Sequence, residues 1–160
     1  MPVLNLKEIF KTSKRFSGFY TIGPKDLNLP ADLGDLEKPV DVEVEIEKVT
    51  GGYLVNLKIK GEIKLECSRC LTPFVKEIES EETVRLENFP EKLTVSLKAQ
   101  DLNVCFLEDE EHFDLTQLVR EQIILSIPTK PLCSPDCTIP TLEEYQEDSR
   151  FIALKRLIQK

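Results

Sequence analysis

The sequence predicts an α+β protein built on an antiparallel β-sheet with a few helices, and three observations lead to this fold class. Apolar and acidic residues alternate with a period of two over residues 40–47. A glycine pair follows shortly afterwards and separates this segment from a second alternating one, as in a β-hairpin. A capped segment at residues 114–127 carries apolar residues at helical spacing. We expect the sheet to be curled toward a barrel, with the helices on one side.

The length and composition of the chain fit one domain. It has 160 residues, of which 41% are hydrophobic, which is enough for a real core. We predict a single domain over residues 1–160: an N-terminal helix and wrapping segment at 1–39, the sheet at 40–107, and a helical part at 114–160. The chain shows neither a signal-peptide pattern nor a run of about 18 apolar residues. These features predict a cytoplasmic protein with no membrane partner.

The N-terminal segment is expected to form a short helix followed by irregular chain. Asn5 is a candidate N-cap for a helix that carries Leu6, Ile9 and Phe10 on one side. The next stretches, SGFYTIG and KDLNLPADLGDLEKP, are interrupted by glycine and proline. We expect them to wrap over the core without regular structure.

The central hairpin has a register that can be predicted from charge and hydrophobicity. With Gly51-Gly52 as the turn, Thr50 lies opposite Tyr53. This register places apolar side chains against one another on one face and opposite charges on the other. The predicted pairs are Glu45 with Lys58, Glu43 with Lys60, Ile46 with Leu57, and Val44 with Ile59.

Further strands and two helices complete the predicted fold. A strand through Ile63 and Leu65 leads directly to Cys67. The extended segments after it carry alternating apolar residues at Ile78, Val84 and Leu86, at Leu93, Val95 and Leu97, and at Leu102 to Leu107. Asp114 and Gln117 have the spacing of a capping box for a helix with a buried stripe of Leu115, Leu118, Val119, Gln122 and Ile123. Pro128 ends that helix, and a closing helix begins near Ser149 and buries Phe151, Leu154, Leu157 and Ile158.

Four of the five cysteines form two short chelating turns. Cys67 and Cys70 are separated by two residues, and Cys133 and Cys137 by three. In a reducing compartment, such pairs more often hold metal than form lasting disulfides. Four thiolates suit tetrahedral zinc. We therefore predict one structural zinc site, which requires the fold to bring the two turns together.

Three other readings of these cysteines stay open. The four thiols could be free of ligand, or they could form disulfides, although a reducing compartment disfavours the latter. The first pair could also serve a thiol redox enzyme or sensor. Reactive pairs of that kind lie at a helix N-terminus, which lowers the thiol pKa. Here Leu71-Thr72-Pro73-Phe74 and extended sequence follow the pair, so the helix is missing.

The remaining candidate residues give little support for catalysis. Cys105 lies in a short apolar run and is expected in the core. His112 is the only histidine, lies among acidic residues and has no nucleophile nearby in the sequence. The acidic run at 108–111 is typical of a solvated loop, and no glycine-rich phosphate loop is present. We predict that the protein is not an enzyme and takes no small-molecule substrate.

The formal net charge of −8 limits the partners. A protein with this charge should repel nucleic acid as a whole, so contact with RNA would have to be local. Two basic clusters could supply it if the termini meet, although each also fits a solvated face or a helix end: Lys7, Lys11, Lys14 and Arg15, and Lys155, Arg156 and Lys160.

Three segments together resemble the YceD family: ECSRCLTPF, DLTQLVREQIILSIPTKPLCSPDC and EDSRFIALKRL. The resemblance covers nearly the whole chain in the same order. It implies that Cys67, Cys70, Cys133 and Cys137 are metal ligands, in agreement with the cysteine spacing. Two departures are Thr138-Ile139-Pro140, where many members have a glycine and further cysteines, and Ser149, where many have proline.

Members of this family are bacterial and plastid proteins linked to accumulation of the large-subunit ribosomal RNA. The resemblance therefore implies a non-catalytic ribosome biogenesis factor. Its expected partner is a basic ribosomal protein, or the pre-ribosomal large subunit, held against the acidic sheet. Local contact with ribosomal RNA is a second version of the same role.

Overall fold

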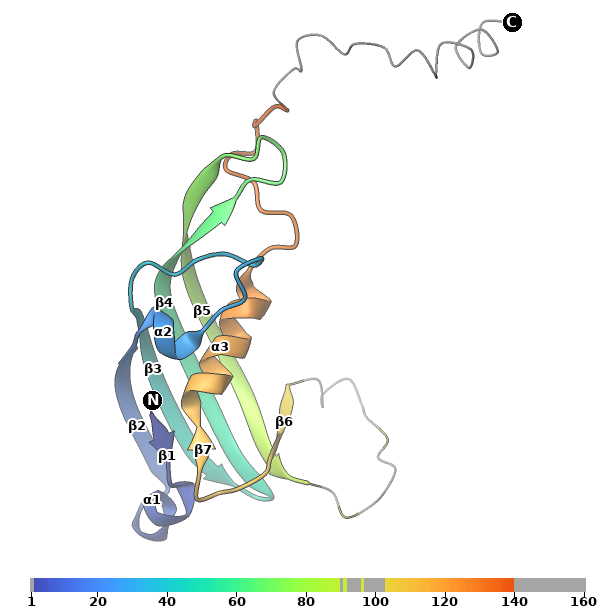
Figure 1. The fold of residues 1–160 in the computed structure, drawn as a ribbon. Coiled ribbons are helices and arrows are strands. Elements are labelled where there is room, and N and C mark those ends of the chain that lie inside the picture. The colour runs from blue at the N-terminus through green and yellow to red at the C-terminus, as the bar shows by residue number, and fades with distance from the viewer. Residues whose placement is uncertain (1, 90, 92–95, 97–102, 140–160) are drawn as a thin grey trace, which may run out of the picture.

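A five-stranded sheet forms the centre of the molecule (Figure 1). The computed structural model describes residues 2–89, 91, 96 and 103–139. The strand order is β2-β3-β4-β5-β6, and β1 pairs with β7 in a separate two-stranded sheet. The strands are β1 (Val3–Leu4), β2 (Arg15–Ile22), β3 (Val40–Val49), β4 (Gly52–Glu66), β5 (Pro73–Asn88), β6 (Val104–Leu107) and β7 (Phe113–Asp114).

The helices are α1 (Leu6–Thr12), α2 (Pro24–Leu27) and α3 (Leu115–Ser126). Helix α3 packs on β4 and β5, and α2 packs beside α3 (Figure 1). Every second side chain of β3 and β4 points to the face of the sheet on which α3 lies. Val44 in β3, Leu57 in β4 and Ile123 in α3 are each at most 1% exposed. The opposite face, which we call the outer face, carries the charged residues and is not covered by any described helix.

The predicted N-terminal helix is confirmed, and its cap is the predicted one. The side-chain oxygen of Asn5 accepts a hydrogen bond from the Glu8 N–H at 3.0 Å. Leu6 and Phe10 are buried. Leu27 and Leu36 from the following segment are also buried, so this segment lies over the core as expected.

The prediction that SGFYTIG is irregular was wrong, because all of its residues except Gly23 lie in β2. Strand β2 pairs with β3 from Arg15 opposite Glu47 to Ile22 opposite Val40. Gly18 and the 68% exposed Phe19 obscure the alternation in the sequence. Pairing with a long neighbouring strand supplies the stability that local propensity lacks.

The register predicted for the hairpin was wrong by two residues. Glu43 lies opposite Lys58 and Val44 opposite Leu57. The turn lies one residue earlier than predicted, with Gly51 at φ +88° and Gly52 already in β4. A shift of two keeps the same side chains on each face, so apolar residues still face inward and opposite charges still meet.

The sheet is mixed, which corrects the prediction of an antiparallel, barrel-like sheet. Strand β6 runs parallel to β5, with Arg85 opposite Val104. The connection over residues 89–103 is long enough for the crossover that a parallel pair requires. The described strands do not close into a barrel, because β2 and β6 are the edges of the sheet.

Helix α3 begins and ends where the sequence predicted. An Asp114 side-chain oxygen accepts hydrogen bonds from the N–H groups of Thr116 and Gln117. The Gln117 side chain donates to Glu121 at 3.2 Å, whereas a capping box would direct it back to the N-cap N–H. The helix ends at Ser126, two residues before Pro128.

Two predicted elements lie outside the described residues: the segment with Leu93, Val95 and Leu97, and the closing helix from Ser149. The division into 1–39, 40–107 and 114–160 also stays a prediction. No helix in the described part of the chain has the length and apolar character needed to cross a membrane.

Candidate metal centre

The first cysteine turn links β4 to β5. Cys67 follows the last residue of β4, and its C=O accepts a hydrogen bond from the Leu71 N–H at 2.9 Å. Leu71 has the left-handed conformation, with φ 59°, which reverses the chain. The Cys67 N–H donates to the C=O of Thr72 at 3.0 Å. This tight turn aims the Cys67 and Cys70 sulfurs to the same side.

The second cysteine turn follows α3 and the extended segment at 127–132. The Cys137 N–H donates to the Ser134 C=O at 3.2 Å, and the Ser134 hydroxyl accepts from the Asp136 N–H at 3.3 Å. These bonds hold Cys133 and Cys137 on one turn. The predicted ligands therefore lie on two separate local structures.

The fold brings all four predicted sulfurs together across 62 intervening residues, from Cys70 to Cys133. The Sγ atoms lie within 4.8 Å of one another. The Cys67 and Cys137 sulfurs are 3.7 Å apart, and those of Cys70 and Cys133 are 3.6 Å apart. This cluster could hold one metal ion. Cys105, the fifth cysteine, lies in β6 and is not part of it.

Hydrogen bonds between the first cysteine turn and residues 131–137 hold the cluster in place. The Ser68 N–H donates to the C=O of Pro131 at 2.8 Å. The Arg69 guanidinium donates to the C=O of Pro135, at 3.3 Å, and to that of Cys137. The Arg69 guanidinium thus bridges the turns through backbone carbonyls. Its role was not predicted, although its place between two cysteines was a signal that could have suggested it.

The sulfurs differ in how readily they release a proton. Hydrogen bonds from the backbone N–H groups of Cys70 and Cys133 lower the pKa of Cys67 to about 6. The hydrogen bond with the Thr72 hydroxyl lowers the pKa of Cys70. Hydrogen bonding to the Cys70 sulfur, together with burial, raises the pKa of Cys137 to about 12. Thiolate is the form that binds metal, so the first turn is prepared for binding and the second must lose its protons to a metal.

Replacement of Arg69 should weaken metal binding without abolishing it. We expect Arg69→Ala to lower metal affinity about 10- to 100-fold, because outer groups that orient ligands contribute on this scale. Arg69→Lys should restore part of the affinity, since both carbonyls accept from the single nitrogen Nη1 and an ammonium also carries several donors on one nitrogen. Competition with a chromogenic chelator measures the affinity, and unchanged affinity in Arg69→Ala would contradict the bridging role.

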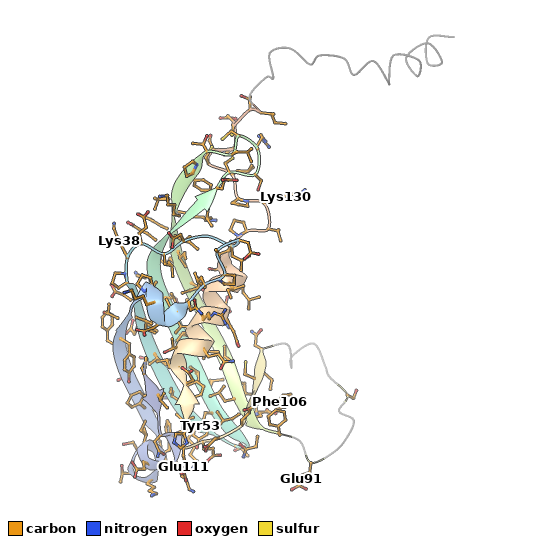
Figure 2. All side chains as sticks on the ribbon, viewed as in Figure 1. Lys38, Tyr53, Glu91, Phe106, Glu111 and Lys130 are labelled. Atoms are coloured by element: carbon orange, nitrogen blue, oxygen red, sulfur yellow. The ribbon has the colours of Figure 1, made fainter. Side chains whose placement is uncertain are left out.

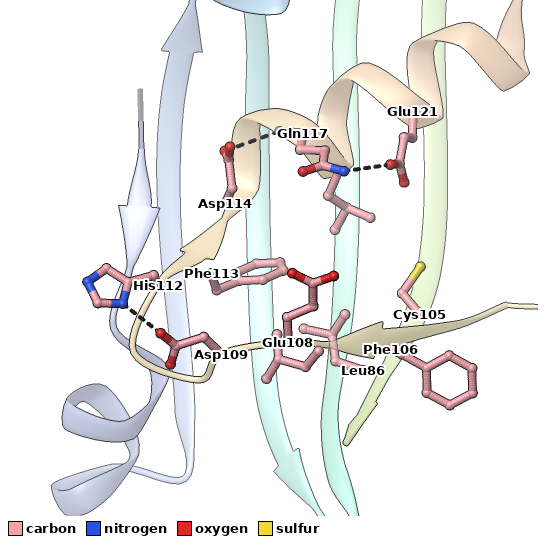
Figure 3. A pocket seen from close by; sticks show the side chains of 12 residues that line it. Leu86, Cys105, Phe106, Glu108, Asp109, His112, Phe113, Asp114, Gln117 and Glu121 are labelled. Carbon is pink, nitrogen blue, oxygen red and sulfur yellow. Dashed lines mark hydrogen bonds and ion pairs between the residues drawn. The ribbon is translucent and has the colours of Figure 1, made fainter. Parts of the chain in front are cut away.

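A second candidate place is a groove of about 420 Å³ between β6 and α3 (Figure 3). His112 contacts Asp109 there at 2.8 Å and is exposed. Cys105 is partly buried, and burial and the charge of Glu121 raise the pKa of its thiol. A thiol kept protonated is a poor nucleophile. Neither this groove nor His112 thus offers an activated nucleophile.

The N-terminal basic cluster lies at the other end of the molecule. Figure 2 shows Tyr53 and Glu111 near α1, and Lys130 on the segment that leads to the cysteine turns. Lys7 pairs with Glu111 at 2.8 Å, and Arg15 pairs with Glu47 at 3.2 Å. The C-terminal cluster, Lys155, Arg156 and Lys160, lies outside the described residues. A joint patch of the two clusters stays a prediction.

Comparisons with known proteins agree with the motifs. Uncharacterised proteins of Mycobacterium bovis and of two Mycobacterium tuberculosis strains are 31% identical over 98 residues, 61% of this chain. The chain spans about half the length of these curated relatives, with 46% of each covered. No solved structure matches the chain. The family model described as "Large ribosomal RNA subunit accumulation protein YceD" matches residues 55–157, which include all four clustered cysteines and leave the first 54 residues outside. The chain therefore belongs to the YceD family.

Proposed function

We propose that this protein is a non-catalytic factor in the biogenesis of the large ribosomal subunit, with a structural zinc site that fixes one end of its sheet. Family membership supports the ribosomal role, since the family is described by accumulation of the large-subunit ribosomal RNA. The observation that carries the proposal further is the four-cysteine cluster, which ties the β4–β5 connection to the segment after α3.

The geometry of the cluster supports zinc as the metal. A tetrahedron with Zn–S bonds of about 2.3 Å has sulfur–sulfur edges of about 3.8 Å. Two of the six sulfur–sulfur separations, 3.6 and 3.7 Å, are close to that value, and all six are within 4.8 Å. All four ligands are protein thiols, as in structural sites, whereas catalytic zinc keeps one position for water. Cys67, Cys70, Cys133 and Cys137 would hold the ion, and it would stabilise the fold.

The outer face of the sheet supports a basic protein as the partner. Strands β3 and β5 turn acidic side chains to this face, and the lysines of β4 lie between them. Lys58 pairs with Glu81 at 3.3 Å and Lys60 with Glu79 at 3.0 Å. The acidic residues exceed these lysines in number, which leaves the face negative. They are Asp41, Glu43, Glu45, Glu77, Glu79 and Glu81.

A thiol redox enzyme or sensor is the rival function, and one observation favours it. The lowered pKa of Cys67, about 6, is typical of reactive thiols. Against it, Cys67 is fully buried, so a substrate disulfide cannot reach its sulfur. Cys70 is followed by a turn and then by β5, so the helix N-terminus of active redox pairs is missing here. We therefore favour the zinc site.

Association with ribosomal particles tests the proposal. Tagged protein should co-purify with large-subunit precursors or ribosomal proteins at low salt. Binding should weaken steeply as the salt rises from about 0.01 M to about 0.1 M, because the Debye length falls from about 30 Å to about 10 Å. Cells that lack the protein should show reduced large-subunit ribosomal RNA, restored by the wild-type gene. Salt-insensitive association, or unchanged ribosomal RNA, would contradict the proposal.

A further inference from the structure

The outer edge of β5 leaves backbone groups unpaired along most of its length. Strand β6 pairs only with residues 85–88 of β5. Among the residues that the structure describes, no strand pairs with residues 73–84 on this side. An open strand edge of this kind is a template for the addition of another strand.

The direction of the backbone groups follows from one hydrogen bond. The Arg85 N–H donates to the C=O of Asn103 at 2.9 Å, so it points away from β4. Strand β5 pairs with β4 in an uninterrupted register, and successive peptide groups point to alternate sides of a strand. The N–H and C=O groups of the odd-numbered residues from 77 to 83 therefore point toward the open edge.

The side chains beside this edge define what an added strand would meet. On the outer face, it would meet Glu77, Glu79 and Glu81, of which the last two have side chains that are 74% and 71% exposed. On the inner face, it would border a groove of about 320 Å³ between β5 and α3. Glu82 and the 76% exposed Leu125 line this groove. The surroundings are thus acidic on one face, and acidic and apolar on the other.

We propose that the β5 edge, residues 77–83, binds an extended basic segment of a partner protein as an added strand. Its outward side chains would be Lys or Arg, which pair with the glutamates of the outer face. Its inward side chains would be apolar and would cover Leu125. This inference rests on the proposed function and adds to it a binding mode that the acidic face alone does not specify.

Charge argues for this occupant over two others. A second copy of the chain that joined edge to edge would place two rows of glutamates against each other, which is destabilising. RNA would be repelled by Glu77, Glu79, Glu81 and Glu82, which are all of the charged residues of the segment 77–83. Main-chain pairing also has no counterpart in RNA. A basic peptide satisfies both the backbone groups and the charges.

Fluorescence anisotropy with the full chain and a labelled peptide of alternating Lys and Val tests the proposal. The chain should bind the peptide, and N-methylation of every peptide amide should abolish binding, because it removes the ladder donors from both edges of the peptide. This peptide control leaves the protein unchanged, so it cannot be confused with misfolding. Equal binding of both peptides would overturn the added strand.

Two variants at one position separate main-chain pairing from charge. Glu79→Pro and Glu79→Ala both remove the carboxylate, but only Glu79→Pro also removes the edge N–H, at a position where an edge strand tolerates proline. We expect Glu79→Pro to bind the peptide about tenfold more weakly than Glu79→Ala, the value of about one hydrogen bond. Equal affinities would overturn the proposal.

Amide hydrogen exchange of the free and peptide-bound chain gives the third measurement. The odd-numbered amides from 77 to 83 should exchange fast in the free chain and slowly with peptide bound. Protection in the free chain would mean that the edge is already covered, by a second copy or by another part of the chain, and would overturn the proposal.

If Glu79→Pro loses the peptide but still associates with large-subunit particles, the added strand fails as the ribosomal contact while the proposed function stands. If the peptide binds and no ribosomal association exists, the proposed function fails.

Discussion

The double variant Cys67→Ser, Cys133→Ser should lose its metal and a large part of its stability. Each substitution removes one ligand from a different turn, so neither turn retains two thiolates. A ligand present at 1,000 times its dissociation constant stabilises the folded state by about 4 kcal/mol, and loss of zinc should cost a similar amount. Thermal unfolding followed by circular dichroism, with zinc measured on the same samples, gives the result.

Cys105→Ser is the matched control for this experiment, because Cys105 is a cysteine outside the cluster. It should keep the metal and change the free energy of unfolding by no more than about 1 kcal/mol. Equal losses of stability in both variants would mean that the four-cysteine cluster has no special role. Full metal content in the double variant would exclude these residues as ligands.

Ile123→Ala should destabilise the protein by about 2–5 kcal/mol, the usual cost of a large-to-small change in a core. Ile123 is 0% exposed and belongs to the buried stripe of α3, the face that packs on the sheet. Its removal leaves a cavity between two layers that are otherwise filled with side chains. Chemical denaturation measures the change in the free energy of unfolding.

Leu125→Ala on the same helix is the control, since Leu125 is 76% exposed. Both variants introduce Ala, the best helix former, into α3, so they differ chiefly in the burial of the side chain that is removed. We expect Leu125→Ala to stay within about 0.5 kcal/mol of wild type. If the two variants lose similar stability, α3 does not pack on the sheet through the face described above.

The features that could be predicted from the sequence were those with a local signal. Alternation from Val40 to Ile46 identified β3, the Asp114 side chain marked the start of α3, and cysteine spacing identified both turns. Each of these depends on residues within a few positions of one another. The meeting of the two turns was also predicted, but only because the chemistry of zinc requires it.

The features that were missed depend on contacts between distant segments. Both hairpin registers keep Val44 and Ile46 inside, so alternation cannot choose between them. The neighbouring strand β5 decides the register. A side chain at position 52 would place its Cβ in collision with the C=O oxygen of Leu86 in β5. Gly52 is therefore needed within β4 itself, and only Gly51 of the pair lies in the turn.

Strand β2 was missed for the same reason, and so was the parallel direction of β6, although a strand at Leu102 to Leu107 was predicted. Residues around Gly18 form a strand because β3 offers a full partner edge. The direction of β6 depends on the path of the connection after Asn88, which no local pattern encodes. Arg69 reaches carbonyls of the second turn, a contact visible only in three dimensions.

The zinc content of the full chain, purified without chelator, is the decisive measurement for the four-cysteine cluster, and native mass spectrometry gives it. The four-thiolate cluster predicts one zinc ion per chain, seen as the added mass of one zinc. Freshly reduced protein that carries no zinc, and takes up none when zinc is supplied, would contradict the central claim.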